Sequence, residues 1–501
     1  PEWLFNECHS HVGDSAETIC LLWPQLKDQC LQRPELKDPQ LRDLLAAVAN
    51  KPTLHWWMET LLPSLARSSP TQQQEAMLSI WATVPEEHHW LLNKLITGGF
   101  RIGVARGLVV KAIAAAFSLR NTDVLERLMG EVEPSAEWFD QLTAPAKQTR
   151  RDRGAVPYPF FLASPVQLER MVCTPAEDWW VEWKWDGIRG QLIHRKEGVF
   201  LWSRGEELVN VSFPELVTMA KALPVNTVLD GEVICWGRDQ CRPLPFSNLQ
   251  RRIGRKHVGA KIRQECPVQF IAYDLLEQEG KDLRAHPLVQ RLTALNALNS
   301  VADIEESWRL QRSAGHRLES WDHLAQLRTI AGEGGAEGLM LKQLSSPYLA
   351  GRQRGHWWKY KLDPMRLDAV LIYAQAGSGR RANLFTDYTF ALWDDRATDD
   401  NKSKLVTFAK AYSGLGDAEI LTLDRWIRSH TRERFGPTRV VEPELVFELG
   451  FEGIQPSKRH KCGLAVRFPR ILRWRHDRTA QSADCLESAE QLLNSPRGER
   501  R

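Results

Sequence analysis

The sequence lacks most of the features that mark membrane, secreted and zinc-binding proteins. No apolar run approaches the ~20 residues that a membrane-spanning helix needs, and no signal-peptide pattern is present. The nine cysteines are scattered from Cys8 to Cys485 without a Cys-x-x-Cys pair, which indicates reduced thiols in an intracellular protein. Cys8, His9 and His11 lie close together, but no second ligand cluster follows them, which disfavours a zinc site. We therefore expect a cytoplasmic protein, associated with the nucleoid if its source is bacterial.

An excess of charge of one sign is also lacking. The 66 basic and 63 acidic residues leave a net charge of +3, so any polyanionic partner must be bound by local patches. A P-loop, a dinucleotide fingerprint and an internal repeat are absent as well. Tyrosine is scarce, with 7 residues against 20 tryptophans, which offer stacking surfaces as well as core packing. The chain begins with Pro1 rather than Met, which indicates a processed or trimmed N-terminus.

The chemistry that is present centres on residues 182–190. Apolar residues lead into Lys184, a strand-like alternation follows, and Gly187 marks a tight turn between them. Burial and neighbouring positive charge lower the pKa of a lysine, and such a lysine can carry a covalent intermediate. Asp186 could orient this lysine, and Arg189 could hold an anionic ligand. The alternative is a half-buried strand whose charged side chains face water.

Three domains are expected within the 501 residues. Three-to-four spacing of apolar residues predicts helices at 41–49, 54–65 and 72–81, and an Ala-rich helix is expected after the turn at 98–107, through residue 117, in a helical domain, residues 1–157. A Pro-rich basic linker follows at 144–159. An α+β domain, residues 158–365, has a largely antiparallel sheet with strands at 180–184, 189–194, 199–202, 228–234, 269–275, 339–342 and 357–361. Residues 366–501 suit a small oligonucleotide-binding β-barrel with strands at 369–373, 388–393, 405–408 and 445–450.

Further charged residues of the α+β domain suit phosphoryl chemistry. Glu232 follows Asp230 and a glycine in one predicted strand, and Glu337 directly precedes another. Lys359 and Lys361 are two apart, so they share one face of a strand. Carboxylates bind Mg²⁺, and cations offset charge on transferring oxygens. The alternatives are a helix-end charge at Glu337 and a solvated strand face for the lysine pair.

Three basic segments are candidates for binding a nucleic-acid backbone. A glycine-punctuated turn at 98–107 carries Arg101 and Arg106, and glycines let a backbone approach a phosphate closely. Arg251 and Arg252 belong to a second basic cluster at 246–256, whose alternative is a solvated helix face. The third segment, near the C-terminus, has few interspersed acids and is typical of a nucleic-acid-binding barrel. Its basic residues are Lys458, Arg459, Lys461, Arg467, Arg470, Arg473, Arg475 and Arg478.

In order and spacing, these motifs resemble the nucleotidyltransferase superfamily of ligases and capping enzymes. Over nearly the whole chain they are most similar to three-domain ATP-dependent DNA ligases of the bacterial type. Residues 184–189 match motif I, 203–205 resemble motif Ia, 230–232 motif III and 272–276 motif IIIa. Glu337 and Gly338 match motif IV, and Lys359 and Lys361 match motif V. Residues 467–470 look like the stretch that leads into motif VI.

The resemblance implies an enzyme that seals nicks in duplex DNA with ATP and Mg²⁺. It implies that Lys184 takes AMP, with Asp186 and Arg189 in catalysis, and that Glu232 and Glu337 bind the metal. Arg101, Arg106, Arg251, Arg252, Arg467 and Arg470 are implied to bind DNA. The resemblance also implies where residues contact the nucleotide. Glu182 would contact the adenine and Tyr273 would stack on it, Arg189 and Glu232 would contact the ribose, and Lys359 and Lys361 would hold the α-phosphate. Arg204 and Arg478 are implied as further nucleotide-binding residues.

One departure from the family pattern lies in motif VI. The family usually reads Arg-x-Asp-Lys, whereas this chain has Arg478 in the last position; Arg and Lys differ in reach and donor geometry. The resemblance further implies a monomer and a hinge at 363–366. The rivals are an RNA ligase, a GTP-dependent RNA-capping guanylyltransferase and a non-catalytic nucleic-acid-binding scaffold. An NAD-dependent ligase is disfavoured, because its tetracysteine zinc module has no counterpart here.

Overall fold

The computed structural model describes residues 14–494 and a few isolated earlier positions. It leaves out 32–38, 50–52, 99, 101–103, 131–134, 146–153, 300–306, 378–382, 397–402, 413 and 437. The chain divides into two compact units, one of residues 1–103 and 366–490 and the other of residues 104–365 and 491–501. Within the described residues, no helix is both long enough and apolar enough to cross a membrane.

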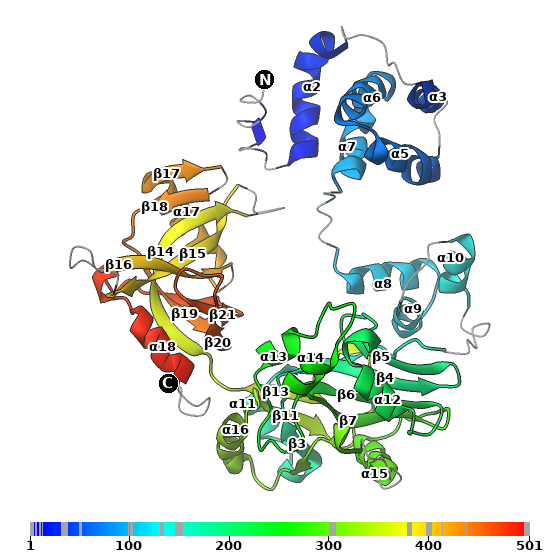
Figure 1. The fold of residues 1–501 in the computed structure, drawn as a ribbon, viewed down its shortest axis with the longest axis vertical. Helices are drawn as coiled ribbons and strands as arrows, with labels where there is room; N and C mark the ends of the chain where they lie inside the picture. The colour runs from blue at the N-terminus through cyan, green and yellow to red at the C-terminus, as the bar shows by residue number, and fades with distance from the viewer. Residues whose placement is uncertain are drawn as a thin grey trace. The chain divides into compact units, whose positions relative to one another are not determined.

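The described residues among the first 143 are mainly helical, as the apolar spacing predicts (Figure 1). A core of buried leucines, Ala76 and Ile80 joins the helices around α6, whose N-terminus is closed by a capping box between Ser69 and Gln72. The predicted helix at 54–65 contains a single π-helical turn. The helices are α2 (Ser15–Leu31), α3 (Pro39–Val48), α4 (Leu54–Trp56), the π turn Trp57–Leu61, α5 (Leu62–Arg67), α6 (Pro70–Thr83), α7 (His89–Thr97), α8 (Arg106–Ala116), α9 (Asn121–Arg127) and α10 (Ala136–Thr143).

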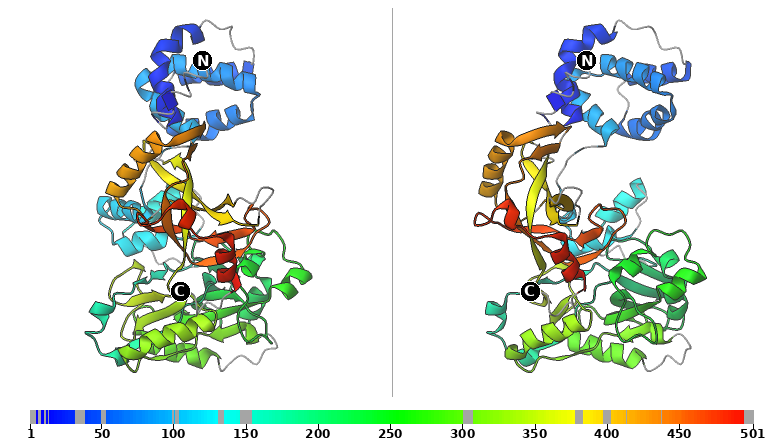
Figure 2. Two further views of the ribbon diagram at one scale, coloured as in Figure 1. Left: turned by 90° about the vertical axis from the view of Figure 1, so that its left-hand side faces the viewer. Right: turned by 60° about the vertical axis from the view of Figure 1, so that its left-hand side comes forward.

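Two mainly antiparallel sheets form the α+β part, residues 154–365, and helices cover their outer faces (Figures 1 and 2). All seven strands predicted here are confirmed. The first sheet has the order β10 (Gly315–Arg317), β3 (Trp179–Trp183), β11 (Gly338–Gln343), β13 (Trp357–Lys361) and β2 (Ser164–Pro165). The second has the order β5 (Gly198–Ser203), β4 (Ile188–Arg195), β6 (Thr227–Cys235), β7 (Val268–Gln278) and β8 (Lys281–Asp282), with β9 (Leu310–Arg312) beside β7.

Successive side chains along these strands point to opposite faces of each sheet, so one face packs into the core and the other faces the candidate site. Outward residues of the second sheet pack under α12 (Pro214–Ala220), α13 (Phe246–Gln250) and α15 (Leu288–Asn299); α14 (Ala260–Glu265) follows α13. Outward residues of the first sheet pack under α11 (Leu168–Met171) and α16 (Leu324–Glu333). The inward faces meet in an aromatic cluster that includes Phe161, Tyr348 and Trp357. The charged residues of the predicted motifs lie on these inward faces.

The C-terminal part contains an open, strongly bent sheet and differs from the expected barrel. Its strands form half-barrels rather than a closed barrel. The four predicted strands are confirmed, but shorter ones and two helices were missed. The elements are β14 (Met365–Ala376), β15 (Phe385–Asp394), β16 (Lys404–Ala411), α17 (Asp417–Ser429), β17 (Thr431–Phe435), β18 (Thr438–Val441), β19 (Val446–Phe451), β20 (Gly453–Pro456), β21 (Leu464–Arg467), β22 (Arg470–Trp474) and α18 (Leu486–Asn494).

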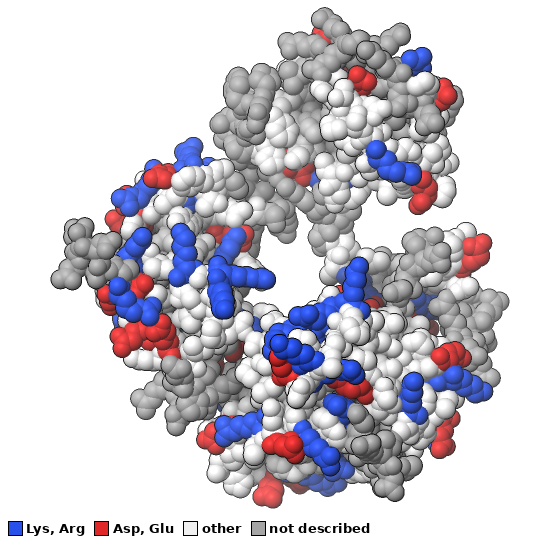
Figure 3. All heavy atoms as spheres, in the orientation of Figure 1, with Lys and Arg blue, Asp and Glu red and all other residues white. Residues whose placement is uncertain are grey.

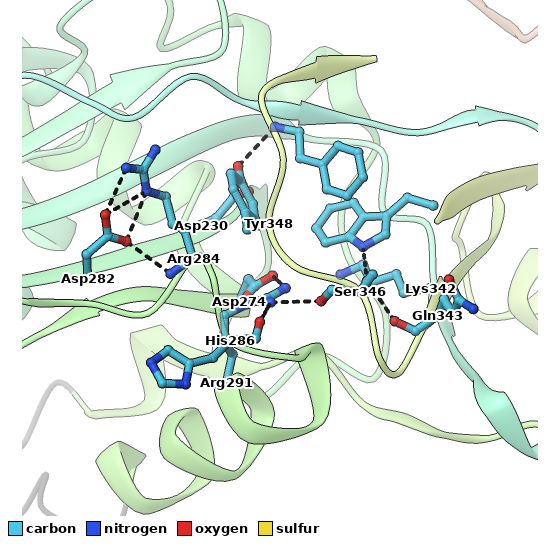
Figure 4. A network of polar contacts seen from close by, with 12 residues as sticks. Asp230, Asp274, Asp282, Arg284, His286, Arg291, Lys342, Gln343, Ser346 and Tyr348 are labelled. Atoms are coloured by element: carbon cyan, nitrogen blue, oxygen red, sulfur yellow. Dashed lines mark hydrogen bonds and ion pairs between the residues drawn. The ribbon is translucent and has the colours of Figure 1, made fainter. Parts of the chain in front are cut away.

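A fully buried ion pair ties α15 to the second sheet (Figure 4). Arg291 donates to both carboxylate oxygens of Asp274, at 2.7 and 2.9 Å, and to the backbone oxygens of His286 and Ser346. Neither side chain of the pair is exposed to solvent. Every strong donor in this network therefore has a partner, which offsets the cost of burying the charges.

Replacing Arg291 with Met should lower the free energy of unfolding by about 3–5 kcal/mol, because Asp274 is left as an unpaired buried charge. Chemical denaturation measures this change. The double replacement Arg291→Met with Asp274→Leu should recover most of the loss. A double variant less stable than the single one would contradict this explanation.

Candidate active site

Lys184 lies where three strands of the first sheet come together. It directly follows β3, and its amide donates to the backbone oxygen of Gly338 at 2.8 Å. The amide of Glu337 donates to the oxygen of Lys184 at 2.7 Å, and the amide of Leu362 donates to the oxygen of Glu337 at 2.8 Å. The ladder of β3, β11 and β13 thus continues past the strand ends and fixes the backbones of motifs I, IV and V together.

The side chain of Lys184 is held by carboxylates. Its Nζ donates to Glu337 Oε2 at 2.6 Å, and Lys361 Nζ lies 3.6 Å from the same oxygen. Burial by itself lowers the pKa of Lys184, but the charges of Glu337, Glu232 and Asp186 outweigh it and hold the pKa above its ordinary value. The sequence-based expectation of a lowered pKa is therefore wrong for the protein alone, because acidic rather than basic groups surround this lysine.

Two carboxylates, Glu232 and Glu337, approach Lys184 from the two sheets. Burial raises the pKa of Glu232 to about 8, and the charges of Glu337 and Asp230 add to this, against Lys184 and Arg189. Burial also raises the pKa of Glu337, but Lys184 and Lys361 reverse the effect and lower it overall. Within the described ranges, no three acidic, His or Cys residues gather as a complete metal cage. A pair of carboxylates fits Mg²⁺, which usually takes its other ligands from water and substrate phosphates.

Gly187 closes the turn that follows the lysine. A Cβ atom at this position would lie 2.3 Å from the backbone oxygen of Val233 and 2.7 Å from Cγ of Glu232. Both distances are shorter than van der Waals contact, so only glycine lets the turn pack against β6. The turn therefore sets the separation between Lys184 and Glu232.

Arg189 is fixed on the inward face of β4. It donates to Asp230 at 2.7 and 3.2 Å and lies opposite Glu232 in the β4–β6 register. The hydroxyl of Tyr348 donates to Asp230 at 2.6 Å, so one acid of motif III orients both residues. The guanidinium also lies 5.7 Å from the ring centre of Tyr273. These contacts bring motifs I, III and IIIa into one pocket wall.

Sequence reasoning missed Lys342, which contacts two of the predicted nucleotide-binding residues. It forms an ion pair with Glu182, and the two side chains are 1% and 2% exposed. Its Nζ lies 4.3 Å from the ring centre of Tyr273 and 4.4 Å from that of Trp357. The one available signal was a single charge in the otherwise apolar start of β11. Burial raises the pKa of Glu182, whereas the charge of Lys342 lowers it.

The remaining predicted nucleotide-binding residues are placed less closely. Arg204 is exposed in the turn after β5, and only its amide, which donates to the oxygen of Arg189 at 2.8 Å, reaches the cluster. Lys359 lies opposite Met340 on the face that carries Lys361. Arg478 belongs to the other compact unit. The structure thus brings together Glu182, Lys184, Asp186, Arg189, Glu232, Tyr273, Glu337, Lys359 and Lys361.

The predicted DNA-binding arginines have different surroundings. Arg106 donates to Glu206 and to the backbone oxygen of Leu128. Arg251 is exposed and pairs with Glu265. Arg467 stacks on the exposed ring of Phe468, and Arg470 lies 3.6 Å from Glu452. Arg101 and residues 146–153 of the predicted linker lie outside the described residues.

The prediction that Arg252 binds DNA is wrong. Its side chain is fully buried and donates to Glu215 at 2.7 Å and to the backbone oxygens of Ser212 and Cys266. It also lies 5.3 Å from the ring centre of Phe213. A phosphate has no access to this guanidinium, which instead joins α13 to the core of the second sheet.

A lysine held against one carboxylate, with a second carboxylate and a further lysine close to it, is the arrangement that the motif resemblance predicts for a covalent nucleotidyltransferase. The sequence profile described as "ATP dependent DNA ligase domain" matches residues 160–361, and the profile of the C-terminal region of the same ligases matches residues 381–478. The chain belongs to the family of ATP-dependent DNA ligases.

Curated relatives agree with this assignment. The chain is 35% identical to a probable DNA ligase of Koribacter versatilis over 86% of its own length and 76% of that protein. It is 33% identical to a DNA ligase of Haloarcula marismortui over 81% of its length and 71% of the relative. A solved structure described as Pmar-Lig_PreS3 has a similar fold, with a TM-score of 0.55, 17% identity, and coverage of 83% of this chain and 84% of that one.

The two adjacent arginines of the second basic cluster should respond differently to replacement. Arg252→Ala should lower the free energy of unfolding by about 3–5 kcal/mol, because it strands Glu215 as a buried, uncompensated charge. Arg251→Ala should leave the stability unchanged, since that side chain is exposed. Thermal or chemical unfolding of both variants checks this difference, and equal stabilities would refute the core role of Arg252.

Proposed function

We propose that Lys184 is the residue that carries AMP and that this ligase seals nicks in duplex DNA. The observation that supports this most directly is the contact between Lys184 Nζ and Glu337, made among Glu232, Lys361 and Asp186. This arrangement provides a nucleophile, an acceptor for its proton and charges of both signs for a phosphate. Such groups act mainly by positioning and by compensating charge.

In the first step, the Nζ of Lys184 attacks the α-phosphorus of ATP. A P–N bond forms, the bond from that phosphorus to the bridging oxygen breaks, and pyrophosphate leaves in line with the attack. Lys184 must lose a proton to attack, and Glu337 already accepts its hydrogen bond. The adenylate is then transferred to the 5′-phosphate at a nick. Finally, the adjacent 3′-hydroxyl attacks that phosphorus and AMP leaves.

Mg²⁺ would be held by Glu337 and Glu232, the two carboxylates that face each other across the site. It would supply positive charge to the oxygens of the transferring phosphate. Burial and, to a lesser extent, the charge of Glu337 raise the pKa of Glu232, and a divalent cation would offset both effects.

The nucleotide would lie across the inward faces of both sheets. Glu182, held by Lys342, would accept a hydrogen bond from the adenine amine, and Tyr273 would stack on the base. Arg189 and Glu232 would contact the ribose. The phosphates would meet Lys359 and Lys361, with Arg204 and Arg478 as further contacts.

A duplex would be bound by Arg101 and Arg106 of the helical domain, by Arg251, and by Arg467 and Arg470. Figure 3 shows Lys and Arg side chains gathered over the face that carries α13 and α14. Arg251, Arg255, Lys256, Lys261 and Arg263 supply exposed positive charge there. We further propose a monomer with domain boundaries after residues 157 and 365, working in the cytoplasm and in repair or recombination.

Lys184→Ala should take no label from α-labelled ATP with Mg²⁺, because the nucleophile is removed. Denaturing electrophoresis measures the covalent label, with GTP as a second substrate. Lys221→Ala, which removes an exposed lysine at the end of α12, should label like the wild type. Stable labelling of the Lys184 variant would exclude this lysine as the nucleophile.

Arg251→Ala should weaken binding to nicked duplex DNA without changing self-adenylation. Loss of one phosphate contact should reduce the slope of log K against log salt by about 1. Arg396→Ala is the matched control, because it also removes an exposed, ion-paired arginine, but one that is not among the proposed DNA contacts. Equal salt slopes in Arg251→Ala and the wild type would remove Arg251 from the DNA interface.

A further inference from the structure

One buried acid near the start of β14 contacts both arginines of motif VI. Asp368 is 6% exposed, and its Oδ2 lies 2.8 Å from Nη1 of Arg475 and 3.3 Å from Nε of Arg478. Its Oδ1 is buried and accepts no hydrogen bond from any described residue. A single carboxylate therefore organises two guanidinium groups, and neither the sequence motifs nor the family resemblance assigned it a role.

Hydrogen bonds fix both the side chain and the backbone of Arg475, so that this residue supports the position of Asp368. Its Nε and Nη2 donate to the two oxygens of Asp477 at 2.9 and 2.7 Å, and its backbone amide donates to Val446. The hydrogen bonds that Arg475 donates to Asp477, together with the charge of Asp368, raise the pKa of Arg475. With 12% of its side chain exposed, Arg475 has little capacity left for a substrate.

Arg478 is held on one side and open on the other. Its Nη1 donates to the backbone oxygen of Ser482 at 2.8 Å, and its Nε faces Asp368. Its Nη2 makes no hydrogen bond to the described residues, and 39% of the side chain is exposed. A guanidinium fixed along one edge presents its other edge in a set direction, which suits the oxygens of a phosphate.

The backbone holds Asp368 in place for this task. The backbone amide of Asp368 donates to Oδ2 of Asp484 at 2.7 Å, and the backbone amide of Asp484 donates to the backbone oxygen of Asp368 at 2.9 Å. Burial holds the pKa of Asp368 above its ordinary value, although the charges of Arg475 and Arg478 oppose this rise. The acid and the two arginines thus depend on one another for charge compensation.

We propose that Asp368 is a positioning residue for lysine adenylation: it fixes Arg478, braced through Arg475, so that the open edge of this arginine meets the pyrophosphate that leaves ATP. This inference rests on the proposed function of Lys184 and Arg478. Negative charge builds on the leaving pyrophosphate as its bond to the α-phosphorus breaks, and a preoriented cation stabilises it there. No pyrophosphate is present in the final step, when the 3′-hydroxyl displaces AMP, so Asp368 should not affect that step.

The test separates the two steps in the full-length protein. Asp368→Asn keeps the shape and removes the charge. It should slow the incorporation of label from α-labelled ATP by about 10- to 100-fold, as misplacement of a catalytic group does. The same variant, given a nick whose 5′-phosphate already carries AMP, should seal it without ATP within about twofold of the wild-type rate. Asp387→Asn is the matched control, since it alters an acid of the same sheet that pairs with Lys410.

A second variant shows whether Asp368 acts through Arg478. If it does, Asp368→Asn combined with Arg478→Ala should be no slower in adenylation than Arg478→Ala alone. Additive losses would overturn the proposal, as would unchanged adenylation in Asp368→Asn. Equal losses in adenylation and in sealing of the preadenylated nick would also overturn it, since they would show a structural role only.

Lys184→Ala in the same labelling assay separates failure of this proposal from failure of the proposed function. If wild type labels and the Lys184 variant does not, an unaffected Asp368→Asn rejects the positioning role alone. If the wild type takes no label even after treatment with pyrophosphate, the proposed function fails and the positioning role fails with it. Should Asp368→Asn not fold, Asp368→Glu and the paired comparison with Arg478→Ala give the same decision.

Discussion

The contact between Lys184 and Glu337 is the interaction on which the site depends. The two residues are far apart in the sequence, but Lys184 directly follows β3 and Glu337 directly precedes the antiparallel strand β11, and the amide of Glu337 donates to the backbone oxygen of Lys184. The sheet therefore holds the two backbones side by side, where their side chains can form the ion pair. The next strand, β13, is bound to the same backbone at Leu362 and brings Lys361 to the same carboxylate.

The charges around Lys184 are not fully compensated within the protein. Lys184 is held protonated by acids, and the pKa of Glu232 is raised by burial and by its acidic neighbours. A phosphate group and a divalent cation would complete this compensation, because each supplies the charge that one part of the pocket lacks. Arg189 with Asp230 and Lys342 with Glu182 are by contrast already paired, which suits residues that hold a pocket wall rather than react. The residues whose charges are already paired thus form the pocket wall, whereas those whose charges are not fully compensated respond to the substrate.

Local sequence patterns predicted the strands, because period-two alternation and glycine turns act over a few positions, whereas the clustering of the motif residues was expected from the family resemblance. The same patterns could not show partners distant in sequence. Arg252 was assigned to DNA from its basic neighbours, yet Glu215 and two backbone oxygens bury it. Lys342 and Asp368 were missed because their roles come from residues on other strands. The pKa shift of Lys184 was predicted with the wrong sign, since the acids around it come from β6 and from the start of β11. The short strands β17, β18 and β20 have too few residues for alternation to be read.

The most direct test of this account is to digest the wild-type protein after incubation with ATP and Mg²⁺ and to locate the added AMP by peptide mass spectrometry under conditions that preserve the P–N bond. The account predicts one AMP on the peptide that contains Lys184, and release of that AMP when pyrophosphate is added back. AMP on another lysine, such as Lys359 or Lys361, or an unmodified Lys184 peptide in a protein that still seals nicks, would contradict it.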